Sequence, residues 1–522
     1  MKQCKILFLA LGCGFAFALG AAAPKVLVYM FDGIRADVFE AVDAPEWKML
    51  KANAWADGYR SAWSVTAEIE PYAETSSAPN HATIATGKLV KNHKAVNNKK
   101  FTSFNLAETP TFLERIARRH PEIGTLFAFS WRSDLVMMQS SGRYVVLCGS
   151  DAGNNRTLCE ILKRPDAPSA LMVFDDAGDG AGHKYGFYPF TKEYLAQAVE
   201  VQKRLGNLLA AIKARPAFAD EDWLIVLCSD HGGFGKRHGL SGGQCSTVPL
   251  LYCGKSIPAG IITGRPGNLD IAAQVLRHFG ITDEIARLDG RRELAAAPAP
   301  AKRPVSDGLL YDLAVKGGKV VNTAPAAGKY GVSPRGELVV GDGFFSTAKG
   351  GFLALDGLRN FGGKAFTFAL TLKCDLAKVT GDPAIFSNKN WRNGLTPGFA
   401  LVARRGGVGF NTACKDAPCN FIVTDPRRMD LSAVVFGADE KTMIAVSIDP
   451  AENVTVFQRS GTSGYANWFC VSAAGVNPHS TLDWIIGQDG TGKYKNSAVI
   501  EVSGFRFWDR ALTLDELRDL KL

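Results

Sequence analysis

Four short, uninterrupted apolar runs decide what the first half of this 522-residue chain can fold into. They begin at Lys25, Ala170, Trp223 and Val248 and read KVLVYMF, ALMVF, WLIVLC and VPLLY. Runs of this length without polar alternation are typical of strands that are buried on both faces of a sheet. Helical patterns such as 111–119 and 192–213 lie between them. The sequence therefore predicts an α/β domain with a mostly parallel sheet flanked by helices, whose ligand site lies beyond the carboxyl ends of the strands.

The amino-acid composition and the predicted secondary structure change after residue 293. Residues 294–304 read LAAAPAPAKRP, which is typical of an Ala/Pro linker. Residues 305–522 contain β-type stretches separated by Gly-, Asn- and Asp-rich turns, with almost no helical pattern. We therefore expect an α/β domain over 23–293 and an all-β sandwich over 305–522.

The N-terminus predicts export. Lys2 and Lys5 precede an apolar stretch over 6–19, and small residues follow it. This pattern is typical of a signal peptide over 1–22, and the stretch is short for a membrane-spanning helix. Cys13, after Leu-Gly, is an alternative site for lipid attachment. We expect a periplasmic or extracellular protein with no transmembrane segment in the mature chain.

Charge and cysteine spacing narrow the classes of ligand. The 60 basic and 51 acidic residues give a formal net charge of +9, but they are spread along the chain, so no nucleic-acid polymer is indicated as a partner. Export permits disulfides, and Cys148 with Cys159 or Cys414 with Cys419 are close enough in sequence to pair. No CxxC pair has the spacing of a zinc site, so any metal must be held by Asp and His.

Acidic and imidazole side chains follow three of the apolar runs. The residues are Asp32 after the first run, Asp179 and His183 after the second, and Asp230, His231 and, seven residues later, His238 after the third. Each of them alone is explained by a turn, a helix cap or an ordinary hydrogen bond. Together they are the ligands that a pair of divalent ions requires, with zinc preferred, and such a pair activates a nucleophile and neutralises phosphoryl charge.

A serine opens the run SAPNHATIAT, which begins at Ser77 and has a helical pattern. Pro79 suits the first turn of a helix, so capping is the structural explanation for Ser77. A hydroxyl at a helix N-terminus also faces N–H groups that bind phosphate oxygens, and metal coordination would make it a nucleophile. Thr75 and Ser76 are adjacent, so composition alone does not select Ser77.

The ordered motifs FDG, SAPNHATIATG, NHKAVNN, DGAGHKYGF and SDHGGFGKRHG resemble the alkaline phosphatase superfamily, in particular the type I phosphodiesterase and nucleotide pyrophosphatase family. The resemblance covers residues 25–290 and implies that Ser77 is the nucleophile. It implies two metal sites with the ligand sets Asp179, His183 and His238 and Asp32, Asp230, His231 and the Ser77 oxygen. Asn98, with Asn97 as a near competitor, matches the asparagine that binds the phosphoryl oxygen, and we expect the Ala78 N–H to assist it.

The resemblance implies an exported two-zinc hydrolase of small-molecule phosphate esters that acts through a phosphoseryl intermediate. Serine in place of threonine and short intervals between the motifs leave the subclass and a nucleotide substrate open. A phosphomonoesterase is one alternative. A sulfatase is another, although His81 stands where the sulfatase motif has arginine. The third is a glycan-binding protein with a degenerate enzyme domain.

The C-terminal region, with FTFALTL and the closing VSGFRFWDRALTLDEL, resembles the laminin-G-like or concanavalin-A-like jelly roll. Such modules often bind glycans. They also serve as spacers. We expect Trp391, Trp468 and Trp484 to occupy core or turn positions, and an exposed one among them would instead supply a sugar platform.

Overall fold

The computed structural model describes residues 22–521, apart from 70–72, 139–143, 240–241, 359, 393–395, 405, 414–427, 436, 438, 474–475 and 477. Residues 1–21 of the predicted signal peptide, and the proposed Cys414–Cys419 pair, lie outside the described residues. Within the described part of the chain, no helix combines the length and the apolar character that crossing a membrane requires.

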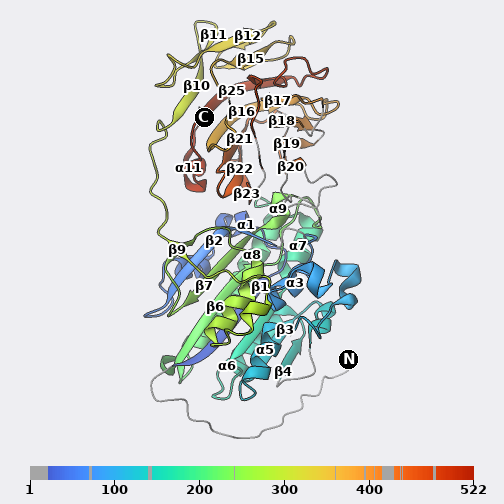
Figure 1. Ribbon diagram of the computed structural model, residues 1–522, viewed down its shortest axis with the longest axis vertical. Helices are drawn as coiled ribbons and strands as arrows, with labels where there is room; N and C mark the ends of the chain where they lie inside the picture. The colour runs from blue at the N-terminus through green and yellow to red at the C-terminus, as the bar shows by residue number, and fades with distance from the viewer. Residues whose placement is uncertain are drawn as a thin grey trace.

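The N-terminal half forms the predicted α/β domain around a nine-stranded sheet (Figure 1). Its strand order is β4-β3-β5-β1-β6-β7-β2-β8-β9. The strands are β1 (Ala23–Phe31), β2 (Arg60–Glu68), β3 (Thr125–Phe129), β4 (Tyr144–Cys148), β5 (Ala170–Asp175), β6 (Glu221–Ser229), β7 (Thr247–Gly254), β8 (Gly260–Ile262) and β9 (Ala296–Ala297). The five strands from β4 to β6 are parallel, whereas β7 runs antiparallel to both β6 and β2. All four apolar runs are strands, and the mostly parallel sheet is confirmed.

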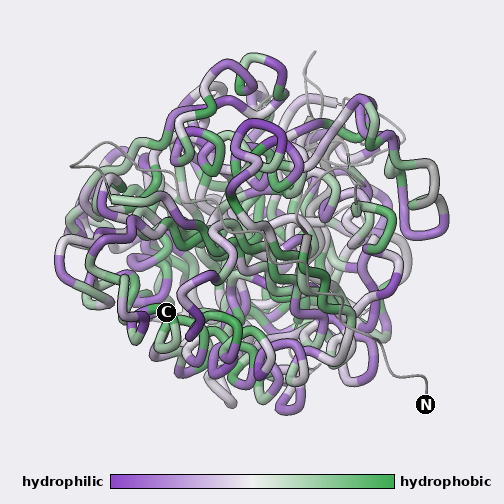
Figure 2. The backbone as a smooth tube through the Cα atoms, turned by 90° about the horizontal axis from the view of Figure 1, so that it is seen from below, coloured by the Kyte–Doolittle hydropathy of each residue, from purple (hydrophilic) through white to green (hydrophobic). Residues whose placement is uncertain are grey.

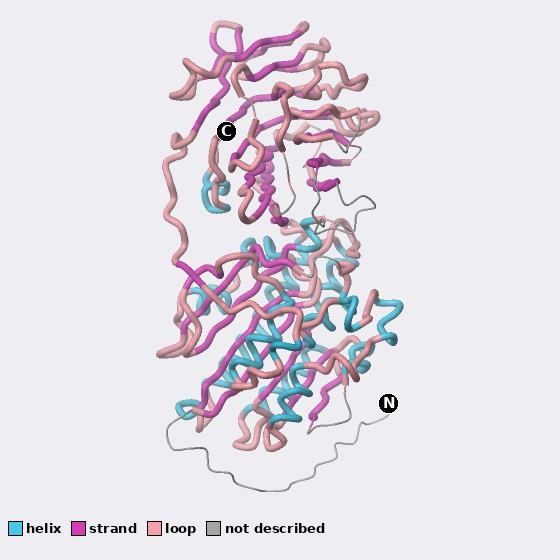
Figure 3. The backbone as a smooth tube through the Cα atoms, in the orientation of Figure 1, coloured by secondary structure: helices cyan, strands magenta, loops and turns pink. Residues whose placement is uncertain are grey.

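Helices cover both faces of this sheet (Figure 3). They are α1 (Ala36–Ala41), α2 (Pro45–Lys51), α3 (Ser77–Thr86), α4 (Val90–His93), α5 (Phe112–Arg119), α6 (Asp151–Leu162), α7 (Ala177–Tyr185), α8 (Lys192–Lys213), α9 (Gly243–Ser246) and α10 (Ile271–His278). Strand β1 shows why its sequence is apolar throughout. Leu27 and Tyr29 enter one hydrophobic core while Val28 and Met30 enter another on the opposite face. Figure 2 shows the hydrophobic segments gathered inside and the hydrophilic ones at the periphery.

The register of three central strands brings the motif residues together. Phe31, near the end of β1, lies opposite Asp175 of β5 and Ser229 of β6. Because the three parallel strands stop at the same level, the residues that follow them share one edge of the sheet. That edge carries Asp32, the start of α7 and Asp230.

The chain leaves the first sheet through β9, which pairs with β8. Ala296 and Ala297, inside the segment predicted as a linker, thus add a short edge strand, because small side chains allow close pairing with Ile261 and Ile262.

The C-terminal half forms two antiparallel sheets that pack face to face around their own hydrophobic core. One sheet has the order β11-β10-β25-β16-β21-β22-β23, with β13 and β14 added beside β25, and the other has the order β12-β15-β24-β17-β18-β19-β20. The elements are β10 (Leu309–Lys316), β11 (Lys319–Asn322), β12 (Val332–Arg335), β13 (Val339–Gly341), β14 (Phe344–Ser346), β15 (Phe352–Leu355), β16 (Phe366–Cys374), β17 (Ala384–Ser387), β18 (Phe399–Arg404), β19 (Gly407–Ala413), β20 (Arg428–Ala433), β21 (Thr442–Ile448), β22 (Asn453–Ser460), β23 (Ala466–Ser472), β24 (Trp484–Ile486), β25 (Ile500–Trp508) and the helix α11 (Leu514–Asp519).

The structure confirms the expected burial of three tryptophans and shows that one permitted disulfide does not form. The three tryptophans considered as a sugar platform are buried, since Trp391 and Trp468 are 4% exposed and Trp484 is 0% exposed. Their rings fill the core or the contact between the two halves, so nothing in the described residues supports glycan binding. Cys148 and Cys159 are both free thiols and do not form the disulfide that their spacing permits.

Candidate metal centre

Two overlapping groups of side chains at the shared strand edge have the composition of metal sites. One group contains Asp32, Asp230 and His231, and the other contains Asp179, His231 and His238. In each group, one ligand atom per residue lies within 4.8 Å of the others. The structure thus brings together five of the six predicted Asp and His ligands.

The first group is almost completely shielded from solvent. The side chains of Asp230 and His231 are 0% exposed, and that of Asp32 is 4% exposed. His231 Nε2 lies 3.2 Å from Asp230 Oδ2 and 3.6 Å from Asp32 Oδ1. Its Nδ1 lies 2.9 Å from the carbonyl oxygen of Gly232, which leaves Nε2 facing the carboxylates.

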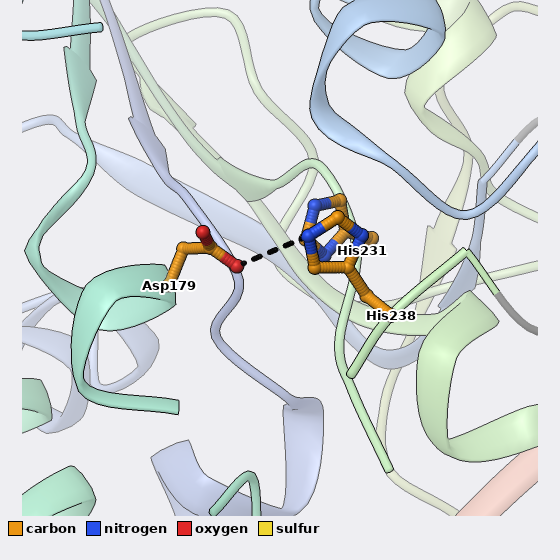
Figure 4. Close-up of side chains that lie close together, drawn as sticks. All are labelled: Asp179, His231 and His238. Carbon is orange, nitrogen blue, oxygen red and sulfur yellow. Dashed lines mark ion pairs between the residues drawn. The ribbon is translucent and has the colours of Figure 1, made fainter. Parts of the chain in front are cut away.

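The second group lies next to it and is more open. Figure 4 shows the rings of His231 and His238 stacked face to face, with Asp179 pointing at them from α7. His238 Nε2 is 3.6 Å from Asp179 Oδ1, and its Nδ1 lies 3.2 Å from the carbonyl oxygen of Thr75.

His183 lies one helical turn after Asp179, as the i, i+4 spacing predicts. Its Nε2 is 3.4 Å from Asp179 Oδ2, and its Nδ1 is 3.0 Å from the carbonyl oxygen of Lys236. The ring is 46% exposed and stands outside the two tight groups. His183 therefore flanks the second group on its solvent side.

Buried oxygens without a hydrogen-bond partner test whether these residues fit a metal. Asp32 Oδ1, Asp179 Oδ1 and Asp230 Oδ2 are all buried and lack such a partner among the described residues. Burial of a carboxylate oxygen without a partner is costly, whereas a divalent cation in each group would satisfy these oxygens. The donor set of carboxylates and imidazoles suits such a cation, so the residues fit.

Burial and neighbouring charges shift the pKa values of the same groups. Burial, together with the neighbouring Asp32, raises the pKa of Asp179 to about 8. Burial and the adjacent Asp230 raise the pKa of Asp32 well above its usual value. Burial lowers the pKa of His238 to about 3, with a contribution from His231. Each of these shifts favours the uncharged form of the group, as burial away from water does.

Ser77 is the first residue of α3 and its hydroxyl points into the first group. The Oγ atom lies 3.3 Å from His231 Nε2, and Ser77 is only 4% exposed. Ser76, not Ser77, occupies the N-cap position, and its side chain makes no capping hydrogen bond. Capping therefore does not account for Ser77.

Asn98 lies beside the nucleophile candidate although it is 21 residues further along the chain. Its Oδ1 accepts a hydrogen bond of 2.9 Å from the Ala78 N–H. The Ala78 N–H is thus engaged in orienting Asn98, and the amide Nδ2 of Asn98 has no hydrogen-bond partner among the described residues. This orientation leaves Nδ2 available to donate to an anionic oxygen near Ser77.

Two functional candidates, His81 and Asp134, were missed by the sequence analysis. The His81 ring is completely buried, and its Nε2 lies 3.3 Å from both Asp32 Oδ2 and Asp230 Oδ2. Its Nδ1 is 2.9 Å from Asp134 Oδ1, which is also completely buried. Burial opposes its charged form, yet Asp134 raises the pKa of His81 well above its usual value. The position of His81 in SAPNH, one turn after Ser77, was the signal that could have pointed to it.

A comparison with protein families gives one match. The model of the type I phosphodiesterase/nucleotide pyrophosphatase family matches residues 130–234. This segment contains Asp179, His183, Asp230 and His231. The resemblance to this family is confirmed.

Curated relatives have related names. A mouse protein, ectonucleotide pyrophosphatase/phosphodiesterase family member 1, is 25% identical over 233 residues, which is 40% of this chain and 24% of the mouse protein. A human protein, bis(5'-adenosyl)-triphosphatase ENPP4, is 23% identical over 248 residues, which is 44% of this chain and 51% of the human protein. The chain thus spans from about a quarter to about half of the length of these relatives. Among solved structures, murine ectonucleotide pyrophosphatase/phosphodiesterase 5 in complex with AMP is 15% identical and covers 53% of this chain and 97% of its own, with a TM-score of 0.39.

Proposed function

We propose that this chain is an exported hydrolase of small-molecule phosphate esters that uses Ser77 as its nucleophile and two divalent metal ions, preferably zinc. The observation that carries the proposal is the position of the Ser77 hydroxyl, 3.3 Å from His231 Nε2, beside buried oxygens of Asp32 and Asp230 that lack hydrogen-bond partners among the described residues. Buried oxygens without hydrogen-bond partners destabilise the folded protein, so a purely structural role does not explain this group.

The ligands are proposed to divide into two sets. Asp32, Asp230, His231 and the Ser77 oxygen would hold one ion, and Asp179, His183 and His238 would hold the other. When bound, the ions would lower the pKa of the serine hydroxyl and offset negative charge on the phosphoryl group.

The residues of the chain then account for the remaining steps. The Ser77 oxygen attacks phosphorus and forms a phosphoseryl bond, while the bond from phosphorus to the leaving alcohol breaks and the alcohol takes up a proton. Water then attacks phosphorus, the bond to Ser77 breaks, and the hydroxyl is restored. Asn98 Nδ2 donates a hydrogen bond to an equatorial oxygen of the phosphoryl group. The Ala78 N–H fixes the orientation of the Asn98 amide by donating to its Oδ1.

Diesters are proposed as the preferred class. The support is the match to the type I phosphodiesterase/nucleotide pyrophosphatase family and the names of the curated relatives. We include nucleotide-containing diesters in this proposal, because the names of the relatives specify nucleotide substrates for those proteins. Export is proposed from the basic, apolar and small-residue pattern of residues 1–22.

The test compares hydrolysis of bis-p-nitrophenyl phosphate with that of p-nitrophenyl phosphate by the zinc-loaded protein. Ser77→Ala should lower the turnover number by at least about 10³-fold, while the metal content stays at two ions per chain. Ser76→Ala is the matched control, because Ser76 is equally buried and adjacent but its hydroxyl has no hydrogen-bond partner. An active Ser77→Ala variant would exclude the proposed nucleophile. The mass of the Ser77 peptide adds a check, since conversion to formylglycine would favour the sulfatase alternative.

A further inference from the structure

The edge of the β-sandwich is closed by side chains of the α/β domain. Strand β23 is the last strand of its sheet, so one row of its backbone groups has no strand partner. The Trp468 N–H donates to Asp37 Oδ2 at 3.2 Å, and the Cys470 N–H donates to Thr247 Oγ1 at 3.0 Å. The Thr247 hydroxyl in turn donates to the Cys470 carbonyl. The α/β domain therefore takes the place of a neighbouring strand.

Asp37 connects this edge to Arg35. Arg35 Nε and Nη2 donate to the two Asp37 oxygens at 2.9 and 2.6 Å, and both side chains are 2% exposed. A buried, two-pronged ion pair of this kind has a fixed geometry. The position of the Arg35 guanidinium is thus coupled to the backbone of β23.

Arg35 also ties together two loops that carry predicted metal ligands. Its Nη1 donates to the carbonyl oxygens of Phe187 at 2.8 Å and of Gly233 at 3.3 Å. Phe187 follows His183 by four residues, and Gly233 lies between His231 and His238. One guanidinium therefore holds the backbone on both sides of the second ligand group.

The packing around Arg35 leaves these loops no room to shift. A Cβ atom on Gly232 would lie 2.2 Å from the Gln244 carbonyl oxygen and 2.8 Å from Arg35 Cγ. A Cβ atom on Gly233 would lie 2.3 Å from the Phe187 ring. The two glycines let the loop lie directly against Arg35 and Phe187, so a displaced Arg35 would displace the loop.

We infer that the C-terminal sandwich positions the metal-binding loops of the hydrolase through the Trp468 N–H, Asp37 and Arg35. Arg35 and Asp37 are then positioning residues, and the sandwich helps to hold the two loops in place through them. The inference rests on the proposed function to the extent that the two loops bind metal. Partners that orient metal ligands from outside the coordination sphere typically change metal affinity by about 10- to 100-fold.

The test uses the full-length chain with Asp37→Asn, Asp37→Ala and Arg35→Lys. The first keeps the volume of the side chain and removes its charge. The last replaces three separate guanidinium nitrogens by a single ammonium nitrogen, which cannot form the two-pronged pair with Asp37. Glu40→Gln is the matched control, because Glu40 pairs with Arg518 of the sandwich at 3.0 Å and with Lys51, but makes no hydrogen bond or ion pair with Arg35. It weakens the same interface without touching the loops.

Two readouts separate this inference from the proposed function. Amide hydrogen exchange over 183–190 and 230–239, measured without metal, should accelerate by at least about tenfold in the Asp37 and Arg35 variants and stay unchanged in Glu40→Gln. Zinc affinity, measured by competition with a chromophoric chelator, should fall by about 10- to 100-fold in the same variants.

The contrary outcomes are distinct. Wild-type exchange and zinc affinity in Asp37→Asn and Arg35→Lys would overturn the inference, as would an equal loss in Glu40→Gln. A wild-type chain that binds no zinc would refute the proposed metal chemistry and the metal part of this inference, while the exchange data would still decide whether the sandwich orders the loops.

Discussion

His81 is the residue whose replacement tests the architecture of the site most directly. Its ring is wholly buried and contacts three carboxylates, of which Asp134 is the closest at 2.9 Å. Replacing His81 with Asn leaves the Asp134 carboxylate buried without its cationic partner. Breaking a buried ion pair from one side costs about 3–5 kcal/mol.

The chain supplies a matched control in His93. This histidine is also 0% exposed, but its ring nitrogens lie near neutral groups, Thr83 Oγ1 at 3.2 Å and the Ala95 N–H at 3.1 Å. Loss of a buried hydrogen bond between neutral groups costs about 1–3 kcal/mol. His93→Asn should therefore destabilise the protein by about 2 kcal/mol less than His81→Asn does.

The assay is thermal unfolding of the metal-free protein, followed by circular dichroism. In a cooperative unit of about 500 residues the entropy of unfolding is about 1 kcal/mol/K, so each kcal/mol shifts the melting temperature by about 1 °C and His81→Asn should lower it by about 3–5 °C. Adding Asp134→Asn to His81→Asn should restore part of the loss, because the second change removes the charge left unpaired. A coupling of about 1–3 kcal/mol between the two changes is expected.

Two results would refute this reasoning. One is an equal destabilisation by His81→Asn and His93→Asn, which would mean that the contacts of His81 with the three carboxylates do not contribute to the stability of the protein. The other is strict additivity of His81→Asn and Asp134→Asn. Zinc-loaded protein should show the same order of variants, because Asp134 lies outside both ligand groups.

Further predictions concern the phosphoryl site and the metals. Asn98→Ala should lower kcat for bis-p-nitrophenyl phosphate by about 10²- to 10³-fold, as loss of an oxyanion donor does, while Asn97→Ala has little effect; equal losses would contradict the assignment. Chelation should remove zinc in two steps, with the ion at Asp179 and His238 leaving first, because those side chains are 20% and 10% exposed whereas Asp230 and His231 are 0% exposed. Zinc release over time, measured by atomic absorption, checks this order. Each ion held at 100 times its Kd adds about 2.7 kcal/mol of stability, so a melting temperature unaffected by chelation would contradict metal binding.

The strands and most of the predicted ligands could be read from the sequence because two simple rules apply to them. Strands buried on both faces are continuously apolar, and β1, β5 and β6 all have this pattern. Parallel strands that end at the same level place their next residues together, which brings Asp32 and Asp230 to one site. Neither rule requires knowledge of side-chain packing.

The missed residues depend on contacts that leave no local pattern. Asp134 is 53 residues from His81 and lies in a short 3₁₀ turn over Arg132–Met137, so only the folded chain brings them together. The contact between Trp468 and Asp37 joins residues 431 positions apart and uses a backbone N–H, which every residue except proline possesses. No pattern in the sequence distinguishes the one N–H that is used.

The shared core of the two halves has a consequence for folding. One hydrophobic cluster contains Leu27 and Phe31 of β1 together with Trp468 and Cys470 of β23, so apolar burial is continuous across the contact. Separating the halves would expose this apolar surface and would also leave the Trp468 and Cys470 N–H groups of β23 without their partners Asp37 and Thr247. Both costs fall on β23, the strand that we infer to support the proposed metal-binding loops. We therefore expect the α/β domain and the sandwich to unfold as one cooperative unit, in which loss of the sandwich and loss of the metal site are the same event.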